Sequence, residues 1–180
     1  MVGFFPMRNA LVLAGAAAVL LGCGGGRLED ALLACPRIAL PPDIADLARY
    51  RDPSAPDLSN LVFQARITGI EGPCRAARGG VEAAISVRFE VERGPAARGQ
   101  AVQLPWLVAI VGPGGEVRDR QRFVLPVGFG ANLTRAQVAS PAITFSFPTQ
   151  EGRRVQDETI LVGFALDEAE LALNRRRGPR

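Results

Sequence analysis

Hydrophobic and polar residues alternate with a period of two through most of the chain after residue 60. The alternation is cleanest over residues 81–91, where every second position is apolar from Val81 to Val91. This pattern is typical of a strand with one buried face. Residues 102–111 differ, because they are apolar on both faces and include Trp106. We therefore expect residues 102–111 to form a central, well-covered strand.

The alternating segments together predict an all-β fold. Further strands are expected at residues 35–40, 61–70, 117–129, 143–147 and 159–166. The run Gly112-Pro113-Gly114-Gly115 between two of the segments indicates a hairpin turn. About seven short strands separated by turns predict an antiparallel, immunoglobulin-like β-sandwich with a short C-terminal helix.

Two segments show helical signals instead. Residues 43–50 place apolar residues at helical spacing, with Asp43 at a plausible N-cap position. Near the C-terminus, Asp167 is followed three residues later by Glu170, an acidic variant of the capping box. We expect a helix in both places.

A targeting signal precedes the predicted strands. An apolar run over residues 11–21 follows the lone early charge Arg8 and ends in Leu20-Leu21-Gly22-Cys23. These four residues resemble the lipobox of bacterial prolipoproteins, in which the cysteine is lipidated and the chain is cut before it. The alternatives are a transmembrane anchor or an ordinary secretion signal, but the run is shorter than the roughly 20 residues that a spanning helix needs.

The resemblance divides the chain into three parts. Residues 1–22 would be the signal peptide, residues 23–34 the lipidated N-terminus and tether, and residues 35–180 the β-sandwich domain. Cys23 would carry a diacylglyceryl group, which implies a membrane partner and an outer-membrane lipoprotein that faces the periplasm. The body also resembles small alphaproteobacterial lipoproteins, a resemblance that implies no activity. It rests on residues 35–37, 92–97 and 171–177.

Two cysteines remain once Cys23 is assigned to lipidation. In an oxidising periplasm, an even remainder predicts a disulfide between Cys35 and Cys74. A redox-active pair is the alternative, although such pairs usually sit in a Cys-x-x-Cys motif.

Composition narrows the possible chemistry. All 21 basic residues are Arg, and the chain has neither Lys nor His. It therefore lacks a Ser-His-Asp triad, an imidazole metal ligand, a P-loop lysine and a Schiff-base lysine. The net charge of +3 is too small to suggest nucleic-acid binding. We expect no nucleic-acid partner, no metal and no cofactor.

Charged side chains supply the remaining candidate sites. Arginine clusters could contact an anionic partner such as a phosphate, a lipid or an acidic protein; alternatively they are solvated faces balanced by nearby acids. The clusters comprise Arg118, Arg120 and Arg122 in one strand, and Arg175, Arg176 and Arg177 near the C-terminus. Glu90 and Glu92 share a strand face and suggest a carboxylate pair, but exposed residues of this kind are more often cross-strand partners.

These observations favour a non-catalytic envelope lipoprotein that binds or stabilises an unknown periplasmic or outer-membrane protein partner. One alternative is a pilotin-like or chaperone lipoprotein that serves an envelope machine. The other is an envelope hydrolase that works through Asp and Glu alone.

Overall fold

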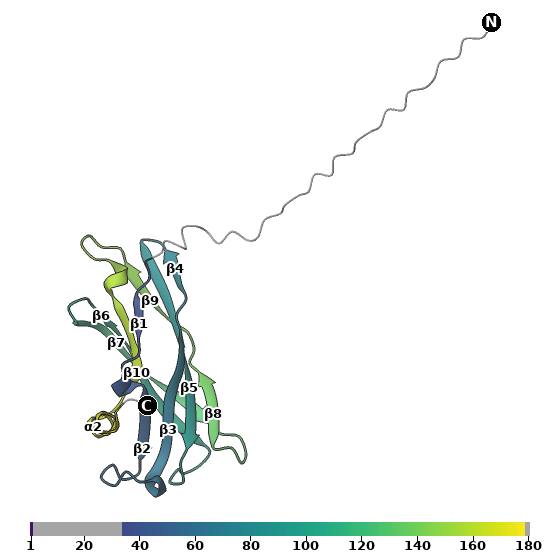
Figure 1. Ribbon diagram of the computed structural model, residues 1–180, viewed down its shortest axis with the longest axis vertical. Helices are drawn as coiled ribbons and strands as arrows, with labels where there is room; N and C mark the ends of the chain where they lie inside the picture. Colours follow the sequence, from purple (N-terminus) through teal and green to yellow (C-terminus); the bar gives the residue numbers. More distant parts are fainter. Residues whose placement is uncertain (2–33, 179–180) are drawn as a thin grey trace.

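The computed structural model describes Met1 and residues 34–178, whose strands form two sheets (Figure 1). Across the first sheet the order is β1 (Arg37–Ala39), β10 (Thr159–Phe164), β6 (Ala101–Val111) and β7 (Val117–Gly128). Across the second it is β2 (Asp46–Tyr50), β3 (Leu61–Glu71), β5 (Gly80–Arg93) and β4 (Cys74–Ala77), with β8 (Arg135–Ala139) and β9 (Ile143–Pro148) also paired to β5. Cys23 and the predicted signal beyond Met1 lie outside the described residues.

The prediction of a mostly β chain with a short C-terminal helix is confirmed, but the expected strand count is too low. The described residues form ten strands, because proline-containing breaks divide two longer strands and because β2 forms where a helix was predicted. β3 and β4 follow one another along β5 on either side of Gly72 and Pro73, and β8 and β9 are separated around Pro141. Proline lacks the N–H group that a sheet ladder needs. One pairing is parallel rather than antiparallel, that of β1 with β10.

Both sheets contribute to a single hydrophobic core. Phe89 of β5 and Trp106 of β6 belong to different sheets, and their ring centroids lie 5.8 Å apart in an edge-to-face arrangement. Phe89 also contacts Phe164 of β10, at 5.7 Å. Phe89 and Trp106 are almost fully buried, as the alternation in residues 81–91 and the apolar character of residues 102–111 predicted. The sheets therefore pack with their inner faces together.

The predicted helix at residues 43–50 is wrong. The segment contains a single 3₁₀ turn, η1 (Pro42–Ile44), followed by strand β2. Leu47 is buried in the core, and Ala48, on the opposite face of the strand, is buried as well. A strand covered on both faces shows neighbouring apolar residues, which imitates helical spacing. Ile44 packs over Gly163 of β10, where a side chain would collide with it.

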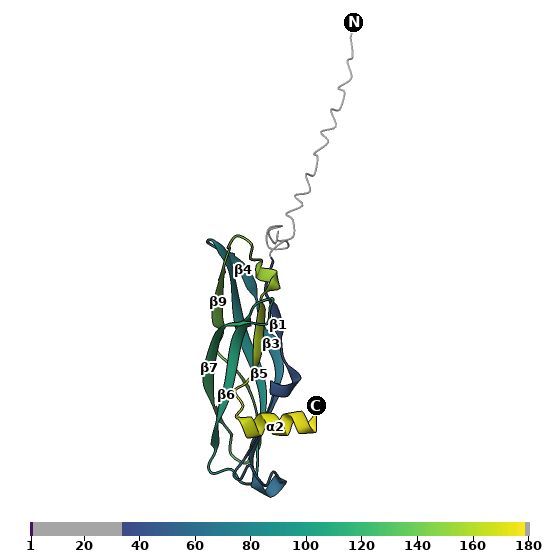
Figure 2. The same cartoon turned by 90° about the vertical axis from the view of Figure 1, so that its left-hand side faces the viewer.

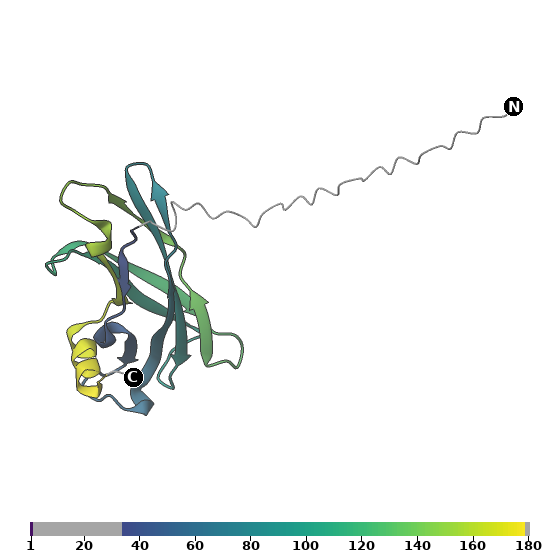
Figure 3. The ribbon, with the colours of Figure 1, turned by 45° about the horizontal axis from the view of Figure 1, so that its top comes forward.

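The C-terminal helix α2 (Glu168–Arg177) lies on the outside of the body beside β2 (Figures 2 and 3). The predicted capping box is confirmed, since Asp167 accepts from the Glu170 backbone at 2.8 Å and Glu170 accepts from the Asp167 backbone at 3.0 Å. Asn174 fixes the other end of the helix by donating to the backbone carbonyls of Asp43 and Asp46. No helix among the described residues is long and apolar enough to cross a membrane.

Candidate functional site

A cleft of about 260 Å³ opens between β7 of the first sheet and β9 of the second. Val155 of the 3₁₀ turn η3 (Val155–Asp157) and the nearby residues Arg153 and Glu158 also line it. The lining combines apolar and polar side chains. The apolar ones are Ile110, Phe145, Phe147, Pro148 and Val155, and the polar ones are Arg118, Asp119, Gln121, Thr144, Ser146, Arg153 and Glu158.

The cleft lies where the inner face of β7 changes from apolar to polar residues. Phe123 pairs with Trp106 and faces the core, whereas the next inward positions are Gln121 and Asp119, opposite Val108 and Ile110. Burying these polar groups without partners would be costly. Instead both stay exposed at the rim of the cleft, where Gln121 Nε2 donates to Asp119 Oδ2 at 3.0 Å.

Glu158 is a buried charged residue in the lining of the cleft. Its side chain is 1% exposed, and its Oε1 lies 2.8 Å from Arg153 Nε and 3.2 Å from Arg118 Nη1. Its other oxygen, Oε2, is enclosed without a hydrogen-bond partner among the described residues. A buried carboxylate needs opposite charges and hydrogen-bond donors to offset the cost of its desolvation. The two arginines neutralise Glu158 but leave one of its oxygens unsatisfied.

Arg118 reaches Glu158 because of a bulge in β7. The register with β6 shifts between Ile110 and Val111, so that Val111 pairs with Val117 and Arg118 has no partner in the ladder. A bulge redirects a side chain in this way. Arg118 also donates to Glu116 at 2.7 and 3.0 Å. A hydrogen bond from the backbone of Glu116 itself, followed by those from Arg118, lowers the pKa of the Glu116 carboxyl.

The predicted stripe of three arginines on β7 is therefore divided. Arg120 and Arg122 pair with Ala109 and Leu107 on the outer face of the sheet and are exposed. β7 is the last strand in the order of its sheet. Charged residues on such an edge discourage pairing with another chain. This gives Arg120 and Arg122 a structural role that requires no ligand, while their contact with an anionic partner stays a prediction.

The second arginine cluster occupies the last turn of α2. Arg175 donates to Asp43 Oδ2 at 3.0 Å, and Arg177 donates to Tyr50 Oη at 2.7 Å while it also lies over the Tyr50 ring. Arg176 is exposed and makes no side-chain hydrogen bond within residues 34–178. Two of the three arginines therefore attach the helix to the body.

Glu90 and Glu92 lie on the outer face of the second sheet and line a second hollow of about 220 Å³. Glu92 accepts from Gln64 at 2.9 Å and lies 3.5 Å from Arg135 on the neighbouring strand. Glu90 lies beside Arg66, because the two residues are paired in the ladder. The cross-strand interpretation of these carboxylates is confirmed by those contacts.

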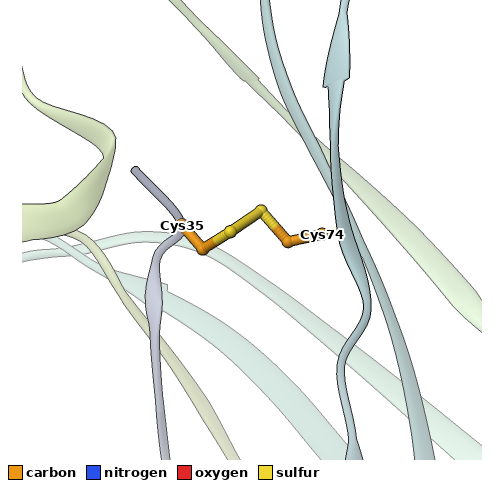
Figure 4. Close-up of a disulfide and its surroundings, with 2 residues drawn as sticks. All are labelled: Cys35 and Cys74. Carbon is orange, nitrogen blue, oxygen red and sulfur yellow. A yellow bond between two sulfur atoms is a disulfide. The ribbon is translucent and has the colours of Figure 1, made fainter. Parts of the chain in front are cut away.

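The predicted disulfide joins Cys35 to Cys74 (Figure 4). Cys35 precedes β1 and Cys74 begins β4, so the bond links the start of the described chain to the second sheet. Figure 1 shows β4, which begins at Cys74, near one end of the body and α2 toward the other. No family model matches the chain, and neither does any curated protein.

Sequence reasoning missed most of the cleft residues, including Asp119, Gln121, Arg153 and Glu158. The sequence did contain a signal for two of them. Asp119 and Gln121 alternate with Phe123 on the same face of the strand, so the apolar pattern of that face is interrupted there by polar residues. Glu158 and Arg153 carry no comparable pattern. Within residues 34–178, no group of three or more potential metal ligands gathers around one point.

Proposed function

We propose that this protein is an envelope lipoprotein whose β-sheet body is held at a membrane by Cys23 and binds a protein partner without catalysis. The observation that supports this most is the position of the disulfide. Cys35 follows Cys23 by twelve residues, and its bond to Cys74 fixes the start of the body at one end.

The tether length sets how far the body stands from the anchor. An extended chain spans at most about 3.5 Å per residue, so twelve residues reach about 40 Å. The end with β4 and β9 would then face the membrane, and the opposite end would project away from it. That opposite end holds the 3₁₀ turn η2 (Leu58–Asn60) and the β7–β8 connection (Figure 1).

The projecting end offers apolar contacts to a partner. Leu58 is 78% exposed and Leu133 of the β7–β8 connection is 56% exposed. The loops at this end are connected, since Arg93 at the end of β5 donates its backbone N–H to Thr134 at 2.7 Å. Exposed apolar residues on loops held by a rigid scaffold are suited to protein binding.

Binding is favoured over hydrolysis by the state of the cleft carboxylates. A carboxylate hydrolase needs one group that gives a proton and one that accepts it or attacks. Glu158 is buried and bound through Oε1 by two arginines, whereas Asp119 lies exposed at the rim and accepts from Gln121, so the two cleft carboxylates do not converge on one open point. A pilotin-like or chaperone role for an envelope machine remains a variant of this proposal, since it too requires binding of a partner.

We also propose that the two sheets form a β-sandwich, which their shared core supports. An immunoglobulin-like layout is the finer prediction. One feature departs from that layout. The successive long strands β3 and β5 are neighbours in one sheet, whereas the successive strands B and C of an immunoglobulin domain lie in different sheets.

Membrane attachment is tested with Cys23→Ser, and Cys74→Ser serves as the matched control. Cells that express each variant are labelled with a fatty acid analogue and fractionated. We expect Cys23→Ser to lose the label and leave the membrane fraction, while Cys74→Ser keeps both. A Cys23→Ser protein that remains acylated and membrane-bound would overturn the anchor.

Partner binding is tested by placing a photo-crosslinking amino acid at Leu133, with Arg78 in the β4–β5 turn as the control position. We expect a discrete protein adduct from position 133 and none from position 78. Repeated failure to obtain an adduct at position 133 would contradict a partner at the projecting end. Loss of one envelope machine on gene deletion would identify the pilotin-like variant.

A further inference from the structure

Strand β7 leaves one edge of the first sheet open. It is the last strand in the order of that sheet and is paired only to β6 within residues 34–178. Figure 2 shows β7 along the left margin of the body, and residues 119–122 are all exposed. An open edge strand offers backbone N–H and C=O groups to an extended segment of another chain.

The register with β6 identifies the backbone groups that face the open edge. Phe129 donates its backbone N–H to Gln100 at 2.8 Å, one step beyond the last pair of the ladder. Residues in an antiparallel ladder alternate between those that exchange hydrogen bonds with the partner strand and those whose N–H and C=O groups point away. The odd-numbered residues from 119 to 127 therefore bond to β6, and Arg120, Arg122 and Val124 direct their backbone groups outward.

The position of Pro126 agrees with this alternation. Pro126 is also even-numbered, so its nitrogen faces the open edge, where the ladder requires no N–H group. Prolines within sheets are confined to positions of this kind. Three successive outward positions, at residues 120, 122 and 124, remain open for hydrogen bonds to another strand.

The side chains at these positions place two uncompensated positive charges on the outer face of the sheet. Of the three arginines of β7, only Arg118 forms an ion pair within the described residues. The neighbours of Arg120 and Arg122 across the ladder are Ala109 and Leu107, and the next positions on β10 are also uncharged. No acidic side chain of the sheet therefore lies beside these two arginines.

These charges distinguish between possible occupants of the edge. A second copy of β7 paired around these residues would bring arginine opposite arginine, and like charges directly opposite one another are destabilising. Acidic side chains at alternate positions would instead meet Arg120 and Arg122 as opposite charges. Val124 is 62% exposed and would suit an apolar neighbour. On the inner face, Phe123 and Leu125 are only half-buried, so apolar residues between the acidic ones would cover them.

From these features we infer that β7 binds an extended segment of a protein partner in which acidic and apolar residues alternate. The segment would join the four-stranded sheet as a fifth strand beside Arg120, Arg122 and Val124. Backbone hydrogen bonds would hold it, and its acidic side chains would pair with the two arginines. The inference does not depend on the anchor at Cys23 or on the contact proposed at Leu133.

The test uses the full-length chain in an uncharged detergent and two labelled, capped peptides of about seven residues. One peptide alternates Glu with Val, and the other carries Lys in place of each Glu. Fluorescence anisotropy measures their binding. We expect a Kd of about 0.1 mM for the Glu peptide and binding that is roughly tenfold weaker or more for the Lys peptide.

Arg120→Glu/Arg122→Glu reverses both charges of the edge. Arg78→Glu/Arg176→Glu is the matched control, since it reverses two exposed arginines outside β7. We expect the edge variant to bind the Glu peptide roughly tenfold more weakly and to prefer the Lys peptide, while the control stays within roughly threefold of the parent. Thermal unfolding establishes that both variants fold. If the edge variant does not fold, Arg120→Gln/Arg122→Gln replaces it, with an expected loss of roughly fivefold.

Amide hydrogen exchange, followed by NMR, tests whether the peptide adds as a strand. Without peptide, the amides of Arg120, Arg122 and Val124 should exchange quickly, whereas those of Gln121 and Phe123 are slowed by their bonds to β6. Glu peptide at about ten times its Kd should slow exchange at the three outward positions roughly tenfold, because each N–H then donates to the peptide.

Four results would overturn the inference. The first is no binding of the Glu peptide at about 1 mM. The second is an equal loss of binding in the edge variant and in the control, which would show an effect of net charge. The third is binding without slower exchange at the outward amides, which would show contact without strand addition. The fourth is a dimer of the parent chain in which those amides are already protected without peptide, which would assign the edge to a second copy.

Discussion

Removing the Cys35–Cys74 disulfide should destabilise the protein by a predictable amount. The bond closes a loop with a sequence separation of 39 residues. In the chain-entropy model, the closure lowers the entropy of the unfolded chain by about 13 cal/mol/K, or about 4 kcal/mol at 25 °C. The double variant Cys35→Ser/Cys74→Ser should lose most of this free energy of unfolding. Serine is close in size to cysteine, so a change in packing should add little to the loss.

The loss is measured by urea and thermal unfolding of the full-length variant and of the oxidised parent protein. A folded body of residues 34–178 has an unfolding entropy of about 0.3 kcal/mol/K, from about 2.1 cal/mol/K per residue. A loss of about 4 kcal/mol therefore lowers Tm by about 13 °C. Reductant should lower the Tm of the parent by a similar amount and leave the double variant unchanged.

The position of the bond adds a local expectation. β1 is a three-residue strand at the edge of its sheet, paired only to β10 within the described residues. Without the disulfide, the amides of β1 should exchange hydrogen much faster than those of β5. A change of Tm below about 3 °C, with β1 still protected, would refute the reasoning that the bond constrains the chain.

Three further predictions concern the core, the helix and one carboxylate. Phe89→Ala should cost about 3–5 kcal/mol in urea unfolding, because its ring is buried between both sheets. Glu170→Gln should weaken the 2.8 Å contact with Arg49 and speed hydrogen exchange in α2, at a cost of about 1 kcal/mol. The NMR titration midpoint of Glu116 should fall below the ordinary glutamate pKa and rise partway back in Arg118→Gln, since the hydrogen bond from its own backbone remains. Its stabilising contribution should be present above that ordinary pKa and disappear as pH falls through the lowered value.

Each of these has a matched control. Phe89→Leu keeps an apolar side chain and should cost much less than Phe89→Ala; equal losses would contradict tight packing. Glu168→Gln changes an exposed residue of the same helix and should leave exchange in α2 unchanged. Arg120→Gln removes an arginine of the same strand that does not contact Glu116. If Arg120→Gln moves the Glu116 titration midpoint as much as Arg118→Gln does, the shift is caused by the loss of positive charge and not by the loss of the hydrogen bonds from Arg118.

Strands that are covered on one face were predictable from sequence. Residues 81–91 and 61–70 lie in β5 and β3 because their alternation matches a buried inner face and a polar outer face. The capping box at Asp167 was predictable for a local reason, since both partners lie within three residues. The disulfide followed from cysteine parity rather than from any knowledge of distance.

The errors arose where tertiary contacts override local pattern. The segment around Leu47 resembles a helix because α2 and the core cover opposite faces of β2, and that arrangement depends on residues more than 100 positions away. Glu158 was missed for the same reason, because its ion pair with Arg118 joins residues 40 positions apart and follows the β7 bulge.

The structure also changes what the arginine-rich composition can mean. Arg118, Arg175 and Arg177 were possible contacts for an anionic partner, and in the structure they bond to Glu158, Asp43 and Tyr50. An arginine committed in this way must break a contact before it binds an anion. The electrostatic prediction is therefore carried by the exposed residues Arg120, Arg122 and Arg176. Arg120 and Arg122 lie on β7 and Arg176 lies on α2, so the three exposed arginines are divided between two separate elements. The proposed recognition of a partner through apolar loops fits this distribution better than binding driven by net charge.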